Sequence, residues 1–134
     1  MSPFKGPCSP VWTAERKRRM IQLKRVYEPP ERADGCRVLV DRLWPRGLPR
    51  EKVRIDEWRK DLAPSDALRR WFGHDPMKRS EFKRRYRQEL SRKRAEIKSL
   101  AEEARHGTIT PVYGARDEQH NNAVVLKELL ERHF

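Results

Sequence analysis

The sequence predicts an α/β fold, with a small and mostly parallel sheet flanked by helices in a single domain. The unbroken apolar run Val38–Val40 is typical of a strand buried on both faces. Along the chain, strand-like and helix-like patterns follow in the order strand, strand, helices, strand, helix, which favours parallel strands joined by helical crossovers. A chain of 134 residues is long enough for one hydrophobic core but not for two.

Composition sets the first limits on function. Charged residues make up 39% of the chain and the net charge is +12, which favours an anionic partner. No apolar run approaches the roughly 20 residues that a bilayer-spanning helix needs, and the first residues lack the apolar core of a secretory signal. We therefore expect a cytoplasmic protein that does not enter membranes.

Residues 1–19 differ from the rest of the chain. They contain three prolines, lack apolar periodicity and end in Glu-Arg-Lys-Arg-Arg, which predicts a disordered basic arm. Met20 begins a more strand-like segment and is a candidate translation start, a hypothesis that the intact mass of the native protein would test. The α/β domain is then expected over residues 20–134.

The individual elements follow from periodicity and boundary signals. Alternating residues predict a strand over 21–27, and a polar stretch after Gly47 predicts a loop with a helical turn around 56–60. Ser65 is suited to cap a short helix that Gly73 ends.

The second half of the chain predicts one long helix, a strand and a last helix. An N-cap and proline at Asp75-Pro76 begin a helix expected to reach about Arg105, with an apolar stripe at residues 82, 86, 90, 97, 100 and 104. Residues 108–113 predict a strand, although Pro111 argues against a position where every amide is paired. A broad apolar arc predicts a buried helix from about His120.

The candidate site lies where the loops after two strands meet at one edge of the sheet. Its residues are Asp41, Arg42, Trp44 and Arg46 after one strand, Arg116, His120 and Asn121 after the other, and Tyr27 at the end of the neighbouring strand. Asp41 and His120 are the candidate acid/base groups. The arginines and Asn121 would bind a phosphate or carboxylate, and Tyr27 and Trp44 would line the pocket.

A structural role for these residues is the alternative. Asp41 could pair with Arg42 or Arg46 and only fix the turn, since charge pairs beside turns are common. The sequence does not decide whether the protein is an enzyme or name a reaction class. The spacing of its cysteines, histidines and carboxylates matches no metal site, and no glycine-rich phosphate loop is present, so no cofactor is expected.

Several strings of the chain resemble one family. They are Lys24–Tyr27, the string Asp-Arg-Leu-Trp-Pro-Arg-Gly at 41–47, Leu62–Ser65 and Ala123–Leu126. The chain resembles the YeaO-like branch of the bacterial domain-of-unknown-function 488 family over residues 20–133. The resemblance implies a Rossmann-like α/β fold and carries no established activity. The family usually has Asn-His where this chain has Asn121-Asn122, and an aliphatic residue in place of Pro111.

Binding of nucleic acid is the alternative function. Residues 78–94 carry nine basic and two acidic side chains, and the basic arm adds positive charge. The candidate contacts are Arg84, Arg85, Arg87, Arg92, Lys93 and Arg94. On a helical wheel these charges lie on both flanks of the apolar stripe, which is more typical of a solvated helix face than of a surface that follows phosphates.

Overall fold

The computed structural model describes residues 21–132, so the predicted arm and Met20 lie outside the described residues. The strands are β1 (Lys24–Arg25), β2 (Cys36–Leu39), β3 (Glu57–Trp58) and β4 (Ile109–Tyr113). The α-helices are α1 (Arg50–Val53), α2 (Asp66–Phe72), α3 (Arg79–Ser91), α4 (Arg94–His106) and α5 (Asn122–Glu131), and the short 3-10 helices are η2 (Arg32–Asp34), η3 (Lys60–Leu62) and η4 (Pro76–Lys78).

The four strands form one sheet in the order β1-β4-β2-β3, and every pair is parallel. This confirms the predicted α/β fold. Within residues 21–132, no helix combines the length and apolar character needed to cross a bilayer.

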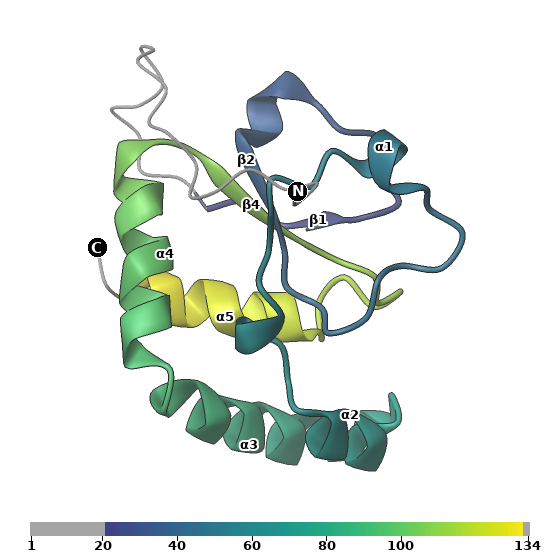
Figure 1. The fold of residues 1–134 in the computed structure, drawn as a ribbon. Coiled ribbons are helices and arrows are strands. Elements are labelled where there is room, and N and C mark those ends of the chain that lie inside the picture. Colours follow the sequence, from purple (N-terminus) through teal and green to yellow (C-terminus); the bar gives the residue numbers. More distant parts are fainter. Residues whose placement is uncertain (1–20, 133–134) are drawn as a thin grey trace.

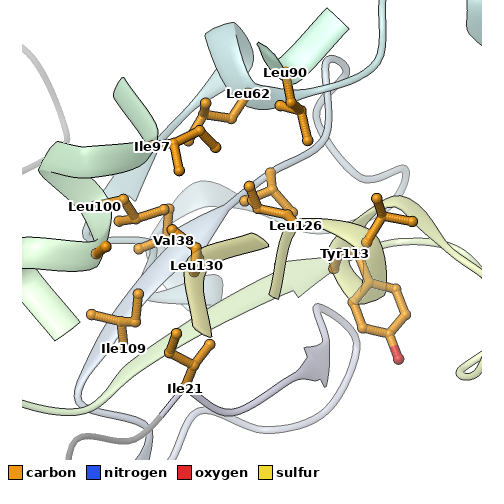
Figure 2. Close-up of a cluster of buried hydrophobic side chains, with 14 of the residues drawn as sticks. Ile21, Val38, Leu62, Leu90, Ile97, Leu100, Ile109, Tyr113, Leu126 and Leu130 are labelled. Atoms are coloured by element: carbon orange, nitrogen blue, oxygen red, sulfur yellow. The ribbon is translucent and has the colours of Figure 1, made fainter. Parts of the chain in front are cut away.

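Each face of the sheet has its own apolar layer. On one face, side chains from α2, α3, α4 and α5 pack on Val38, Ile109 and other strand residues, and α5 lies between the sheet and α3 (Figure 1). Figure 2 shows this cluster, with Leu126 and Leu130 of α5 facing Val38. On the other face, Val53 of α1 and the loop residues around it cover Leu39.

The predicted long helix is in fact two helices. The chain leaves helical geometry at Arg92 and Lys93, and α3 and α4 run in different directions (Figure 1). The break falls in the widest gap of the apolar stripe, between Leu90 and Ile97, which are both buried. The bend lets α3 bury its apolar stripe beside α5 while α4 buries its own stripe against the same core. A straight helix of about 30 residues would be about 45 Å long, too long to pack along its whole length on this core.

Pro111 occupies a central strand, which the sequence argued against. The carbonyls of Ile109 and Tyr113 accept from the β1 side, and those of Thr108 and Val112 accept from β2. Pro111 alternates with Ile109 and Tyr113, so its missing N–H falls on the side of β1, which has only two residues. The ladder to β2 therefore keeps its donors.

The predicted cap of α2 is confirmed, and α5 begins with a cap that the sequence analysis did not predict. Ser65 Oγ accepts from Leu68 N at 3.1 Å, and Asn121 Oδ1 accepts from Val124 N at 3.0 Å. Gly73 ends α2 with a left-handed φ of 52°. By contrast, β3 forms where a helical turn was expected, because Glu57 and Trp58 pair with Val38 and Leu39.

Candidate functional site

Asp41 lies two residues beyond the end of β2 and joins several elements. Its Oδ2 accepts the Gly114 N–H at 2.7 Å, and its Oδ1 accepts from Asn122 Nδ2 at 3.3 Å. Its backbone carbonyl accepts from the Trp58 indole at 2.7 Å. Asp41 thus connects β2, the end of β4, the first turn of α5 and β3.

Burial raises the pKa of Asp41, although its bonds to Gly114 and Asn122 act in the opposite direction. Fully buried Tyr86 lies near enough for the charge of Asp41 to help raise the pKa of its phenol, after burial itself. The Tyr86 hydroxyl donates to the Leu62 carbonyl. Asp41 is therefore a desolvated carboxylate with its acceptors in use.

Arg42 and Arg46 do not face Asp41 as a pair. Arg42 Nε donates to the Pro64 carbonyl at 3.2 Å and lies 3.9 Å from the Asp66 carboxylate. Arg46 is exposed, and its carbonyl accepts from the Tyr27 hydroxyl at 3.3 Å. Among residues 21–132, neither arginine forms a hydrogen bond or ion pair with the Asp41 carboxylate.

The predicted aromatic residues lie in different surroundings. Trp44 donates its indole N–H to the Leu48 carbonyl at 2.7 Å and packs edge-on against Trp58, with ring centroids 5.4 Å apart. It belongs to the apolar layer on the second face of the sheet. Tyr27 is 43% exposed and Arg116 is exposed, so both are accessible from solvent.

His120 and Asn121 form a second group around Asp117. His120 Nδ1 lies 3.1 Å from Asp117 Oδ2, and Asn121 Nδ2 donates to the Asp117 carbonyl at 2.8 Å. Hydrogen bonds from the N–H groups of Gln119 and His120 lower the pKa of Asp117, against a smaller effect of burial. The predicted site residues therefore divide between an Asp41 group and an Asn121 group, and the residue of α5 that reaches Asp41 is Asn122.

A cleft of about 340 Å³ opens beside the Asn121 group, between α2, α3 and the first turns of α5. Its floor includes Phe72 and Phe82, whose rings stack with centroids 4.3 Å apart. Arg79 and Lys83 of α3 lie on its rim with His120 and Asn121. The rest of the lining is Ser80, Gln119, Val124, Val125 and Glu128.

Sequence reasoning missed most of this cleft. The apolar stripe that includes residue 82 indicates a buried helix face, and no sequence pattern marks Phe72, Arg79 or Lys83 as site residues. The lining comes from three separate segments, so no linear spacing could have assembled it. The prediction of His120 and Asn121 as site residues points to this corner of the fold.

One cluster has the composition of a metal site. Ligand atoms of Cys36, Glu57 and Glu103 lie within 4.8 Å of one another. However, Cys36 is disulfide-bonded, and Glu57 lies 3.7 Å from Arg59. Cys36 therefore has no free thiolate to bind a metal, and the cluster supports no metal assignment.

Comparison with known proteins places this fold in a family. The model of the family DUF488-N3i, described as "Inactive DUF488-N3 subclade", matches residues 20–134. The chain is 42% identical over 110 residues to "Uncharacterized protein YeaO" of Escherichia coli K12, covering 82% of this chain and 96% of that protein. It is 41% identical over 112 residues to "Uncharacterized protein Rv3073c" of Mycobacterium tuberculosis H37Rv, covering 82% and 92%. No solved structure matches the chain.

Proposed function

This chain belongs to the DUF488-N3i family, and we propose that it is a binding domain for a small phosphate-bearing, nucleotide-like ligand rather than a catalyst. The ligand would occupy the cleft between α2, α3 and α5. The observation that carries the proposal is the combination in that cleft of a paired aromatic floor and a cationic rim.

The size and lining of the cleft suit such a ligand. Its volume of about 340 Å³ falls within the roughly 300–1,000 Å³ typical of small-molecule sites. Phe72 and Phe82 offer an apolar surface to a planar base, and the rim offers charged donors to a phosphate.

The rim cations can be redirected to a ligand at little cost. Arg79 pairs with Asp117 at 2.8 Å and Lys83 with Glu128 at 3.3 Å, and the four side chains are 36–42% exposed. Ion pairs this exposed contribute only about 0–1 kcal/mol, so a ligand phosphate could compete for the cations. The N-terminal amides of α5, beside Asn121, add a further preference for an anion.

Two features support binding rather than catalysis. The side chain that reaches Asp41 from α5 is Asn122. The family that the chain resembles usually has histidine at this position. Unlike histidine, an amide neither takes up nor releases a proton near neutral pH. His120 pairs with Asp117 at the surface instead. The description of the subclade as inactive agrees with this assignment.

A thermal-shift screen of the full chain tests the proposal. The ligands are nucleoside monophosphates, sugar phosphates and nucleosides, each at about 50 and about 300 mM salt. A nucleotide present at about 100 times its Kd should stabilise the protein by about 2.7 kcal/mol, a shift of several degrees. Nucleosides should shift the protein less, because they lack the group that contacts Arg79 and Lys83.

Matched variants locate the site. Lys83→Gln should weaken nucleotide binding, whereas Lys127→Gln, which removes a comparable ion pair with Glu131 elsewhere on α5, should leave it unchanged. Equal loss in both variants would contradict the cleft. Loss on Arg46→Ala instead would move the ligand to the loop that follows β2.

Binding of nucleic acid through residues 78–94 is the second candidate, and one observation favours it. Arg92 and Arg94 are exposed, and within the described part of the chain no ion pair is recorded for either. By contrast, Arg84, Arg85 and Arg87 already pair with Glu81 or Glu128. Binding to a long oligonucleotide that is lost on Arg92→Gln/Arg94→Gln, and absent at about 300 mM salt, would favour this candidate.

A further inference from the structure

The cleft continues into a second depression along α3. This second depression, which we call the α3 groove, has a volume of about 500 Å³ and is lined by Ser80, Lys83, Arg84, Arg87, Gln88 and Ser91. Ser80 and Lys83 line both the cleft and the α3 groove. The two depressions therefore share a border.

The α3 groove follows one face of a helix for a useful length. Its first and last lining residues, Ser80 and Ser91, are eleven positions apart, which corresponds to about 16 Å along the axis of α3. That length is several times the roughly 3.4 Å axial spacing of phosphates along one strand of a duplex. The groove is therefore long enough for more than one phosphate.

The groove keeps a surplus of positive charge after its own ion pairs are counted. Glu128 is shared by Lys83 and Arg87, at 3.3 and 2.8 Å, and Glu81 is shared by Arg84 and Arg85, at 2.6 and 2.9 Å. Arg85 does not line the groove, so its three lining cations, Lys83, Arg84 and Arg87, face two carboxylates and one positive charge is left over.

One nitrogen atom of Arg87 also lacks a hydrogen-bond acceptor. Its Nη2 reaches Glu128, while its buried Nε has no hydrogen-bond acceptor among the described residues. A small turn of the guanidinium toward an incoming phosphate would supply one.

The inference builds on the proposed function and names its ligand class. We propose that the ligand is a short single-stranded oligonucleotide, with its terminal nucleotide in the cleft and its following phosphates along the α3 groove. Arginine forks match phosphate oxygens, and Ser80, Gln88 and Ser91 are residue types that commonly bind nucleic-acid backbones. The aromatic floor at one end suits a base, which an acidic peptide does not provide.

A length series tests the inference. Affinity of the full chain is measured by isothermal titration for a 5′-phosphorylated mononucleotide, dinucleotide and trinucleotide at about 50 mM salt. The trinucleotide should bind at least about tenfold tighter than the mononucleotide. The slope of log K against log salt should steepen by about 0.7 for each added phosphate.

Two double variants with the same loss of charge provide the control. Arg84→Gln/Arg87→Gln should abolish the gain with length and leave mononucleotide binding unchanged. Arg92→Gln/Arg94→Gln removes two cations that do not line the groove and should keep the gain. Equal loss in both double variants would mean that diffuse charge, not the groove, attracts the strand, and would overturn the inference.

The remaining outcomes separate the two proposals. If the mononucleotide binds but affinity does not increase with oligonucleotide length, the proposed role of the α3 groove is wrong and the proposed role of the cleft is kept. A trinucleotide that binds through Arg84 and Arg87, with no measurable mononucleotide affinity, overturns the cleft as the anchoring end. Competition by an oligoglutamate of equal charge, at equal affinity, would overturn the assignment to nucleic acid.

Discussion

Asn122 donates its side-chain amide both to the Val40 carbonyl at 2.8 Å and to the Asp41 carboxylate at 3.3 Å. The first turn of α5 is thereby attached to the end of β2. An amide at this position holds the carboxylate by a hydrogen bond but has no proton to exchange with it near neutral pH. The contact therefore contributes to positioning, and among the described residues no cationic side chain pairs with Asp41.

The raised pKa of Asp41 predicts a specific pH dependence of stability. Because burial raises the pKa in the folded state above 3.8, the folded protein binds a proton more tightly than the unfolded chain. Asp41 therefore adds stability below pH 3.8 that is lost as pH rises through the folded pKa. Asp41→Asn should remove this slope, so the free energy of unfolding of the variant, relative to the original protein, should rise with pH.

Urea unfolding at several pH values between about 3.5 and 7 measures this difference. Asp66→Asn is the control, because it makes the same chemical change at an exposed carboxylate. A difference between Asp41→Asn and the original protein that stays constant with pH would show that the carboxylate titrates normally.

Tyr86→Phe tests the buried hydrogen bond to Leu62. The ring is fully buried, so removing the hydroxyl leaves the Leu62 carbonyl without its donor and should cost about 1–3 kcal/mol. Tyr27→Phe is the matched control, since its hydroxyl donates to Arg46 at 3.3 Å from an exposed position and should cost less than about 0.5 kcal/mol. Equal costs in denaturant unfolding would contradict this account.

Asp34→Ala should be among the most damaging substitutions. Burial alone would raise the pKa of Asp34, but bonds from the Glu31 N–H, Arg37 and Lys24 outweigh it and hold the pKa below 3.8. Arg37 lies 2.6 Å from Asp34 and is 2% exposed, so losing the carboxylate leaves a buried cation and should cost about 3–5 kcal/mol.

The same pair predicts how acid affects the protein. The stabilisation from Asp34 is present above pH 3.8 and should be lost as pH falls through its lowered folded pKa.

Glu131→Ala is the control for Asp34→Ala. It removes a 3.8 Å surface pair with Lys127 and should change the free energy of unfolding by less than about 0.5 kcal/mol. A small effect of Asp34→Ala would show that solvent reaches Arg37.

Two glycines with positive φ should respond differently to alanine. At Gly35, with φ +62°, a Cβ would lie 2.3 Å from the Thr108 carbonyl oxygen, so backbone must move; at Gly47, with φ +77°, no atom lies within 4 Å. Gly47→Ala should cost only the conformational strain of about 1–2 kcal/mol, and Gly35→Ala clearly more. Thermal unfolding of the two variants measures the difference, and equal losses would contradict the predicted clash.

Local signals predicted what depends on neighbours in sequence. The Val38–Val40 run, the cap at Ser65 and the order of the main elements were all available from residue types and spacing. The break between α3 and α4 was not, because no proline or glycine marks residues 92 and 93; packing of both halves on one core produces it.

The arrangement of the candidate site depends on long-range packing. The sequence placed Asp41 and Asn121 at the same edge of the sheet, but the helical phase of α5 decides that Asn122 contacts Asp41 and Asn121 caps the helix. Similarly, the cleft exists only because Phe72, Lys83 and His120 meet from three segments. Periodicity within one segment does not predict contacts between residues of different segments.

The strand order also has a consequence for synthesis on the ribosome. β1 and β2 are close in sequence, yet β4 lies between them, and Lys24 pairs with Val112. The centre of the sheet cannot close until residues 109–113 have emerged, long after β1 and β2. Until then, the apolar faces of β2 and of the emerging helices lack their partners, so nascent chains of this protein should depend on chaperones until β4 has emerged.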